Sequence, residues 1–351
     1  CDVAPTVCVG KNYVDQASVK SVIETIKNNN FDAVIPNYID LDQYRKNGGY
    51  KISEQVREGI IDNGQIIKTL KESGLKGKGG AGFPTGMKWE IVSKYEGKKY
   101  VAVNGDEGEP GTFKDRSYLE KDPHRFLEGA LIASLFIKAS NVYIYMRDEY
   151  PAVIKILKDE ILKLENENII PAGHFIIRRG AGAYICGEES AMIESIEGKR
   201  GLPRHRPPYV AEVGLFNSPT LTNNLETLFW IRDIIEKGSE WFAGKGVSGN
   251  KGFHSFSVSG RVKEPGVKVA PAGVTIQELI DDYCGGMKED HIFKGYLPGG
   301  ASGGILPASM NNIPLDYGSK ELTDAGCFLG SAAIVVLSDK DSMKDVTLNL
   351  L

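Results

Sequence analysis

The residues best suited to bind a ligand stand in glycine-rich stretches, and the first of these is GLKGKGGAGFPTGMKW. Gly77, Gly79 and Gly82 satisfy the spacing G-x-G-x-x-G. The dinucleotide fingerprint of that form follows a strand and opens a helix, whereas a helical pattern precedes this one, and the phosphate P-loop spacing is absent. What remains is a side-chain-free run flanked by Lys78 and Lys88. It can lie against a planar ring or phosphates, or it can be a structural turn.

A second loop, NGDEGEPGTFKDR, carries acidic and amide side chains directly after a predicted strand. Ligands of open α/β sheets bind at this carboxyl end of the strands. Asn104, Asp106, Glu107 and Glu109 place hydrogen-bond acceptors close together in the chain. Metal ligation is one interpretation, but no histidine is near, and hydrogen bonding to a ribose or to a polar ring edge fits as well. A solvated acidic loop is the alternative.

The third stretch, HFIIRRGAGAYICGEESAMIESIEG, has the order strand, glycine loop, helix. This order aims backbone amides and the positive end of the helix dipole at an anion. Glu188 and Glu189 stand at the helix start, where the dipole favours them, and they can also bind ribose hydroxyls. Cys186 is a potential nucleophile of a cysteine-dependent hydrolase, but no histidine–aspartate pattern supports it. A small buried thiol is the alternative.

Two further stretches are ambiguous from their residues alone. EGKRGLPRHRPPY is basic and stiffened by three prolines, so it can meet a phosphate, meet an acidic partner or be a solvated loop. Its basic side chains are Lys199, Arg200, Arg204, His205 and Arg206. In SPTLTNNLETL, Asn223 and Asn224 precede a helical pattern and can bind a ligand or cap the helix.

The elements that must position these loops indicate an α/β domain. Buried-strand patterns alternate with helical patterns, an order that predicts a parallel sheet. The strands are expected at 100–104, 141–146 and 175–178, and the helices at 124–140, 151–164 and 188–197.

The pattern changes after residue 250, where short strands around one helix indicate a small α+β domain. These strands are expected at 256–262, 267–270, 295–298 and 332–337, and the helix at 275–283. At the other end, residues 1–30 read as two short strands and an amphipathic helix, too small to fold alone. Residues 31–50 read as a linker.

Composition narrows the functional classes. Of the 351 residues 41 are glycine, and 22 of these fall within 74–111, 180–201 and 285–304, which favours a binding cleft built from loops. The 42 basic and 46 acidic residues give a net charge of −4, which argues against a positive electrostatic field that would attract nucleic acid. No membrane-length apolar run or signal peptide is present. Five cysteines without close pairing favour a reducing compartment, so a cytoplasmic location is expected.

Together, the motif strings quoted above are far more specific than any one of them. They occur in the order seen in the NADH-binding flavoprotein subunit of respiratory complex I, which the chain resembles over about residues 50–351. The same module occurs in NAD-linked [FeFe]-hydrogenases, bifurcating hydrogenases and NAD-dependent formate dehydrogenases. The resemblance implies a Rossmann-like parallel-sheet domain that binds FMN and NAD(H), at 51–250, and a β-grasp (SLBB-like) domain at 251–337.

The resemblance also implies which residues hold the ligands. FMN is expected on Gly77, Gly79, Lys88, Asn104, Asp106, Gly187, Glu188, Asn223 and Asn224. NADH is expected on Gly80, Ala81, Phe83, Glu109, Tyr184, Glu189 and Tyr209. Phe83 and Tyr209 would flank the adenine. Glu189 would meet the adenosine ribose and repel the 2′-phosphate of NADPH, which favours NADH.

The two ends of the chain resemble parts of larger electron-transfer proteins. CDVAPTVCVGKNYVDQ looks like the end of a thioredoxin-like [2Fe–2S] domain, with Cys1 as its last cluster ligand. The chain starts with cysteine rather than methionine, which suggests a fragment. In the family a [4Fe–4S] domain follows the β-grasp domain, so residues 338–351 would begin the connection to it. No complete cluster is expected within this chain.

The resulting hypothesis is a diaphorase module, in which hydride passes between NAD(H) and FMN and electrons leave singly to iron–sulfur subunits of a larger complex. Hydride transfer itself strictly needs no acid–base residue. The alternative is a non-catalytic scaffold that binds a nucleotide or docks subunits, with the basic loop 199–206 and the acidic loop 106–109 as interface features.

Overall fold

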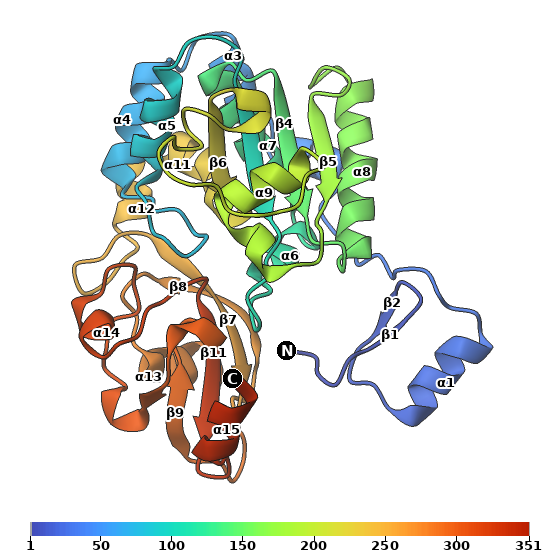
Figure 1. The fold of residues 1–351 in the computed structure, drawn as a ribbon, viewed down its shortest axis with the longest axis vertical. Helices are drawn as coiled ribbons and strands as arrows, with labels where there is room; N and C mark the ends of the chain where they lie inside the picture. Colours follow the sequence, from blue (N-terminus) through green and yellow to red (C-terminus); the bar gives the residue numbers. More distant parts are fainter. Residues whose placement is uncertain (1, 351) are drawn as a thin grey trace.

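The computed structural model describes residues 2–350 and contains three parts (Figure 1). A small N-terminal segment stands apart from the rest, a large α/β part lies above, and a smaller part built on a mixed sheet lies below it. The predicted ligand Cys1 lies outside the described residues. No helix within residues 2–350 has the length and apolar character needed to cross a bilayer.

The N-terminal segment is a hairpin followed by one helix. Its elements are β1 (Val7–Val9), β2 (Asn12–Val14) and α1 (Val19–Lys27). The two strands pair antiparallel, and α1 buries none of its side chains. The Tyr13 hydroxyl donates to the carbonyl of Glu149 at 2.7 Å, which ties the hairpin to the α/β part.

The α/β part is built on a four-stranded parallel sheet in the order β5-β4-β3-β6. Its strands are β3 (Tyr100–Gly105), β4 (Asn141–Met146), β5 (Phe175–Arg179) and β6 (Thr220–Asn224). The first three were expected from their apolar runs, whereas β6 was not. The chain builds outward from β3 to β5 and then returns to the opposite side of β3. The strand order therefore reverses between β3 and β6, the place where open parallel sheets bind ligands.

The two faces of this sheet are covered unequally. Alternate side chains point to opposite faces, so Val101 and Val103 pack into the main helical core, whereas Tyr100 and Ala102 pack towards α9. Most helices pack on the face that carries Val101 and Val103. They are α3 (Lys51–Arg57), α4 (Asn63–Ser73), α5 (Thr85–Ser93), α6 (Lys114–Leu119), α7 (Pro123–Ile137), α8 (Pro151–Asn166), α10 (Leu225–Phe229), α11 (Ile231–Lys237) and α12 (Ser239–Ala243). The other face carries α9 (Glu189–Ile196).

The prediction of a linker at 31–50 needs correction, because its second half belongs to the core of the α/β part. Residues Leu41–Lys46 form helix α2, capped by Asp40. Leu41, Tyr44 and Tyr50 are buried in the main hydrophobic cluster. The Tyr44 hydroxyl and the Tyr50 amide both donate to the buried carboxylate of Glu128 on α7, at 2.7 and 2.9 Å. These hydrogen bonds hold the segment against the domain.

The smaller part has the α+β character expected from its short strands. Its mixed sheet runs in the order β10-β9-β11-β7-β8, with β7 and β11 parallel and the other neighbours antiparallel. The elements are β7 (Phe253–Gly260), β8 (Gly266–Pro271), α13 (Ile276–Glu278), β9 (Phe293–Leu297), β10 (Leu306–Pro307), α14 (Lys320–Asp324), β11 (Ala333–Ser338) and α15 (Met343–Leu350). The expected helix 275–283 begins as α13 and continues as a π-helical turn, Leu279–Tyr283.

A buried polar chain joins the two larger parts. Lys78, from the first glycine loop, donates through its Nζ to the Nδ1 of His254 on β7 at 3.0 Å. The Nε2 of His254 then donates to Asp316 at 2.6 Å, and Asp316 also accepts from Lys76 at 2.8 Å. Since Nδ1 accepts and Nε2 donates, the imidazole is neutral. Burial and the nearby Lys78 ammonium lower the pKa of His254 to about 4.

This junction predicts an acid-sensitive fold. The unfolded histidine takes up a proton near its ordinary pKa of 6.5, whereas the folded one does so near 4, so acidification between these values favours unfolding. His254→Gln can keep both hydrogen bonds and cannot titrate. From pH 7 to pH 4.5, the wild-type free energy of unfolding should fall about 2–3 kcal/mol further than that of the variant. Urea titrations at both pH values measure this difference.

The matched control is His291→Gln, which removes a half-buried histidine that contacts Ser338 at the edge of the smaller part. It removes a histidine without touching the Lys78–His254–Asp316 chain, so it should not reproduce the effect of His254→Gln. Equal pH dependence in the wild type and in His254→Gln would contradict the neutral buried imidazole.

Candidate functional site

Two adjoining cavities open where the strand order reverses. The larger has a volume of about 760 Å³ and the smaller about 330 Å³. They share lining residues from the ends of β3 and β6 and from the two glycine loops, namely Gly79, Asn104, Gly187, Glu188 and Asn224. A cleft of this size at a topological switch point is the expected place for a nucleotide cofactor.

The structure brings together nearly all of the residues expected to bind ligands. The larger cavity is lined by Gly77, Gly79, Ala81, Phe83, Lys88, Asn104, Gly187, Glu188, Glu189, Tyr209, Asn223 and Asn224. The smaller is lined by Gly79, Gly80, Asn104, Glu109, Tyr184, Gly187, Glu188 and Asn224. Asp106 lines neither, because it lies buried behind the wall, where a Cβ on Gly187 would stand 3.5 Å from its Oδ2. Burial raises the pKa of Asp106 to about 6.

The three asparagines of the site line the cavities, and each also forms a hydrogen bond within the chain. The Nδ2 of Asn104 donates to the Gly187 carbonyl at 2.7 Å, which fixes the glycine loop before α9 on β3. Asn223 accepts from the Trp89 indole at 3.0 Å, which leaves its amide nitrogen as the group that can donate to a ligand. Asn224 caps α10 by accepting from the Glu226 amide at 3.0 Å, so the capping interpretation holds for this residue.

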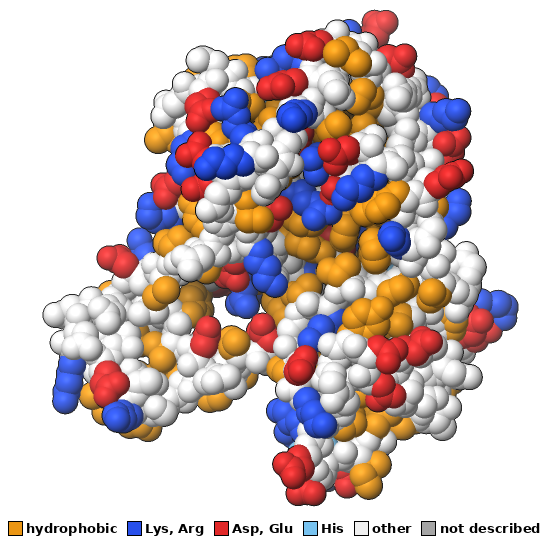
Figure 2. All heavy atoms as spheres, turned by 180° about the vertical axis from the view of Figure 1, so that it is seen from behind, with side chains coloured by type: hydrophobic (Ala, Val, Ile, Leu, Met, Phe, Trp, Pro, Cys, Tyr) orange, Lys and Arg blue, Asp and Glu red, His pale blue; other side chains and the backbone are white. Residues whose placement is uncertain are grey.

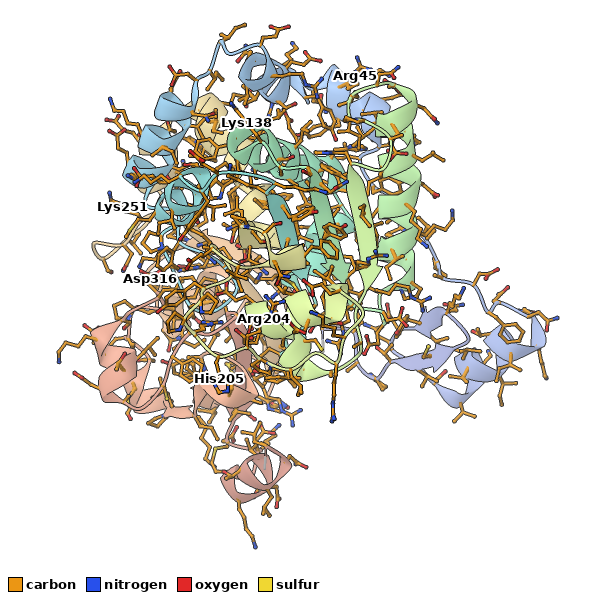
Figure 3. All side chains as sticks on the ribbon, turned by 45° about the horizontal axis from the view of Figure 1, so that its top comes forward. Arg45, Lys138, Arg204, His205, Lys251 and Asp316 are labelled. Atoms are coloured by element: carbon orange, nitrogen blue, oxygen red, sulfur yellow. The ribbon has the colours of Figure 1, made fainter. Side chains whose placement is uncertain are left out.

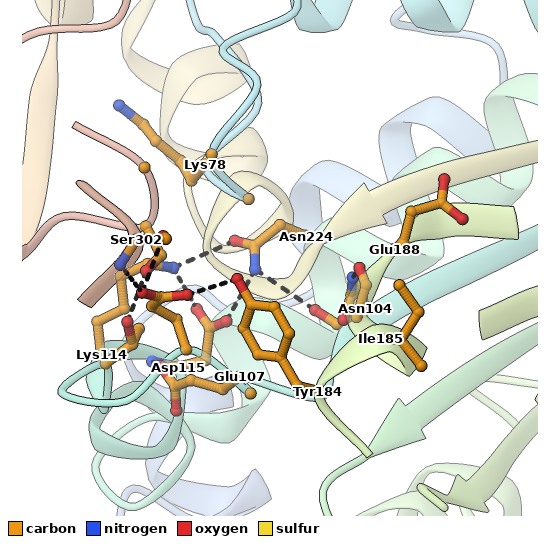
Figure 4. Close-up of a pocket in the computed structure, with 18 of the residues that line it drawn as sticks. Lys78, Asn104, Glu107, Lys114, Asp115, Tyr184, Ile185, Glu188, Asn224 and Ser302 are labelled. Carbon is orange, nitrogen blue, oxygen red and sulfur yellow. Dashed lines mark hydrogen bonds and ion pairs between the residues drawn. The ribbon is translucent and has the colours of Figure 1, made fainter. Parts of the chain in front are cut away.

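A buried ion cluster lies under Asn224 and was missed by the sequence reasoning (Figure 4). The Lys114 ammonium contacts Asp115 at 2.8 Å and Glu226 at 3.0 Å, and all three side chains are at most 3% exposed. Burial alone would lower the pKa of Lys114, but the two carboxylates raise it well above its usual range. The signal was the pair KD within TFKDR, which the chain places beside the glutamate of NLETL.

Glu107 belongs to the same cluster and is not a solvated acid. Its two carboxylate oxygens accept from the backbone amides of Asp115 and Arg116, at 2.7 and 3.2 Å, so it holds the start of α6. Burial and the neighbouring Asp115 raise the pKa of Glu107 to about 7. The acidic loop is therefore largely an internal structural element.

The helix start at α9 also differs from the expectation of an anion site. The Glu188 carboxylate accepts from the backbone amides of Ser190 and Ala191, both at 3.0 Å. Two of the amides at this helix start are thus already satisfied by the protein. Glu188 and Glu189 both pair with Arg206 from the basic loop, and Glu189 also pairs with Lys88 at 3.4 Å.

The third glycine window, residues 285–304, closes the smaller cavity from the side of the mixed sheet, and its contact with Glu109 was not predicted from the sequence. Ser302 donates to Glu109 through its amide and its hydroxyl, at 3.1 and 2.9 Å, and Tyr184 donates to the same carboxylate at 2.6 Å. Gly300 has a φ of +80°, and a Cβ there would stand 2.8 Å from Glu109. Phe328 and Gly330 complete this wall. Loops from both larger parts therefore enclose one site.

The remaining alternatives from sequence have little support in this geometry. Cys186 is 2% exposed and packs with Tyr145 and Met192 behind α9, as a structural thiol does. Within residues 2–350, no group of three or more histidine, cysteine, aspartate or glutamate side chains is arranged to hold a metal ion. Lys and Arg side chains are interspersed with acidic ones on the face shown in Figure 2.

The chemistry of the larger cavity fits FMN. Gly77, Gly79 and Gly187 give it stretches of wall without side chains, against which a planar ring can lie. A Cβ on Gly79 would already contact the Asn224 Cβ, at 3.4 Å. Lys88 supplies a cation, and the Thr85 hydroxyl on this wall is buried without a hydrogen-bond partner. An unsatisfied buried hydroxyl is costly, so a bound polar group there would be favourable.

Known proteins show the same combination of sequence and fold. The family model of the Nuo51 FMN-binding domain matches residues 70–233. The F subunit 2 of NADH-quinone oxidoreductase from Rhizobium meliloti is 42% identical over 312 residues, covering 86% of this chain and 73% of the relative. The corresponding F subunit from Aquifex aeolicus is 40% identical over 323 residues, covering 90% of this chain and 74% of the relative.

A solved structure extends the likeness to the whole fold. The structure of an NAD⁺-reducing [NiFe]-hydrogenase in the air-oxidised state matches 97% of this chain with a TM-score of 0.81 and 30% identity. This chain spans 60% of the length of that hydrogenase chain. The sequence and structural matches agree with the cavity at the switch point, and the chain belongs to the family of FMN-dependent NADH dehydrogenase flavoprotein subunits that includes the F subunits of NADH-quinone oxidoreductases.

Proposed function

We propose that this chain is the NADH:acceptor oxidoreductase module of a multisubunit complex. Hydride passes between NAD(H) and FMN, and electrons then leave singly to iron–sulfur clusters. The observation that carries this proposal is the pair of joined cavities at the β3–β6 switch point, enclosed by three glycine-rich loops. Bound FMN supplies the chemistry, since it accepts a hydride and releases electrons one at a time.

The chain's own residues bind and orient the two ligands. Residues assigned to FMN are Gly77, Gly79, Lys88, Asn104, Gly187, Glu188, Asn223 and Asn224, with Asp106 supporting the wall from behind. Residues assigned to NADH are Gly80, Ala81, Phe83, Glu109, Tyr184, Glu189 and Tyr209. Phe83 and Tyr209 are 41% and 59% exposed although they line the larger cavity, so their rings are available to an adenine.

The polar groups of the site act by position rather than by proton transfer. Glu109 is fixed between Tyr184 and Ser302, and a carboxylate so held can still accept from a ribose hydroxyl. The Asn104–Gly187 hydrogen bond keeps the glycine loop before α9 against β3, which preserves the width of both cavities. Preorganised groups of this kind lower the entropy cost of aligning two reactants.

The larger assembly is part of the proposal. We assign residues 1–30 to the end of a thioredoxin-like [2Fe–2S] domain, 51–250 to the FMN/NADH domain, 251–337 to a β-grasp domain and 338–351 to the connection to a [4Fe–4S] domain. The hydrogenase similarity favours a hydrogenase-type complex. Cys186, Cys284 and Cys327 are buried free thiols, which supports a reducing compartment such as the cytoplasm.

The non-catalytic scaffold remains the second candidate, and the loop contacts count against it. Its two interface features are largely engaged within the chain, since Arg204 pairs with Glu194 and Glu197 and Glu107 is buried. A docking loop whose Lys199, Arg204 and Arg206 are already paired within the chain offers less charge to an acidic partner.

The proposal predicts a yellow protein that NADH bleaches under anaerobic conditions. Gly79→Val should lower the bound FMN at least tenfold, because a branched side chain would enter the neck shared by both cavities. The ratio of FMN to protein after gel filtration measures this loss. Gly64→Val adds the same side chain to an exposed turn of α4 and should keep its flavin. A wild-type chain that rejects micromolar FMN would count heavily against the proposal.

A second prediction concerns the choice of dinucleotide. Replacing Glu189 by glutamine removes a negative charge from the larger cavity, so the ratio of kcat/KM for NADPH to that for NADH should rise about tenfold or more. The measurement is the initial rate of ferricyanide reduction with each nucleotide. An unchanged ratio would remove Glu189 from the dinucleotide site.

A further inference from the structure

The Glu189 carboxylate forms ion pairs with two cationic side chains at once. Its Oε1 lies 3.4 Å from the Arg206 guanidinium, and its Oε2 lies 3.4 Å from the Lys88 ammonium. The Thr222 hydroxyl also donates to Oε2, at 3.3 Å. All four residues line the larger cavity. Both cations are therefore beside the dinucleotide pocket, and they share the single negative charge of Glu189.

Arg206 has a second anchor that does not depend on Glu189. Its guanidinium also contacts Glu188, whose other oxygen is fixed by the amides at the start of α9. The Arg206 and Glu188 side chains are 39% and 31% exposed, so this pair is neither free in solvent nor fully buried. Because Glu188 is locked in the helix cap, Arg206 should stay beside the cavity when Glu189 is neutralised.

We propose that Arg206 is a latent phosphate-binding residue, and that dinucleotide choice is set by the Glu189–Arg206 pair rather than by Glu189 alone. This inference rests on the proposed function. Arginine presents a planar fork that matches phosphate oxygens, and NADP(H) differs from NAD(H) by a 2′-phosphate. The Glu189 carboxylate both repels that phosphate and competes with it for Arg206. Where glutamine replaces Glu189, an arginine already held beside the cavity by Glu188 can bind the phosphate.

The neighbouring arginine of the same loop provides the matched comparison. Arg204 lies two residues earlier, alongside α9 (Figure 3). It pairs with Glu194 and Glu197, and it also donates to the Val213 and Gly214 carbonyls, at 3.1 and 3.3 Å. The larger cavity is lined by Arg206, whereas Arg204 faces away from it towards these partners. Removing either arginine changes the net charge of the loop equally.

The experiment compares two double variants of the FMN-loaded protein. One adds Arg206→Gln to Glu189→Gln, and the other adds Arg204→Gln to Glu189→Gln. Kd values for NADP⁺ and NAD⁺ are measured by equilibrium titration, together with kcat/KM for NADPH and NADH. Glu189→Gln with Arg206→Gln should lose on the order of tenfold in NADP⁺ affinity relative to Glu189→Gln, since a charge-assisted hydrogen bond is lost. Glu189→Gln with Arg204→Gln should stay within about twofold of Glu189→Gln. NAD⁺ affinity should change little in either.

Two further measurements keep the test decisive if a double variant is unstable. NADP⁺ affinity of Glu189→Gln should fall more steeply with added salt than NAD⁺ affinity does, because a cation–phosphate contact has been gained. Arg206→Lys in the same background keeps the charge without the fork and should retain part of the gain.

Particular results would overturn the inference. If the Arg206→Gln double variant keeps the NADP⁺ gain, Arg206 does not bind the phosphate. If the Arg204 control loses as much affinity, the effect belongs to the general charge of the loop. Failure of the proposed function gives a different outcome, namely a wild-type protein that NADH does not bleach.

Discussion

The buried ammonium of Lys114 is the interaction on which the site depends. It stands at the junction of α6, β6 and α10, where it contacts Asp115, Glu226 and the Asn224 amide oxygen. Glu226 in turn accepts from Ser255 on β7, at 2.6 Å, so the same cluster reaches the smaller part. An ion pair this deeply buried is costly to break, because the remaining charge would have no water around it. The floor of the cavities is therefore fixed before any ligand binds.

A second polar chain fixes the opposite side of the cavities. Lys78 belongs to the first glycine loop, and its contacts with His254 and the Phe253 carbonyl hold that loop against β7. Glycine-rich backbone is otherwise flexible, and a loop without side chains has little hydrophobic surface to anchor it. Lys78 is the one long side chain between Gly77 and Gly82, and placing the anchor there leaves the glycine surface clear. The mixed-sheet part thus contributes to the shape of the site and not only to its periphery.

The apolar patterns predicted the frame of the fold better than the residues of the site. β3, β4 and α8 were predictable because their buried side chains follow simple periods. β6 was not, since TLTNN is polar and forms a strand only because β3 offers an unpaired edge. Helix α2 was predicted as linker because it has few apolar residues. What holds this segment is hydrogen bonding to the buried Glu128 on α7, which is far away in the sequence. The site residues came mainly from family resemblance, and the ion cluster needed three-dimensional pairing.

The capped start of α9 is the feature that lets the proposed phosphate selectivity rest on few side chains. In many nucleotide-binding α/β proteins the backbone amides at a helix start bind the phosphate, and such amides cannot be changed by substitution. Here Glu188 satisfies the amides of Ser190 and Ala191, so side-chain cations such as Lys88 and Arg206 take a larger share in recognising an anion in the larger cavity. Under the proposed function, the Glu189 carboxylate shares its charge between these two cations. A change at this one side chain would then alter the choice of dinucleotide without changing the backbone of the site.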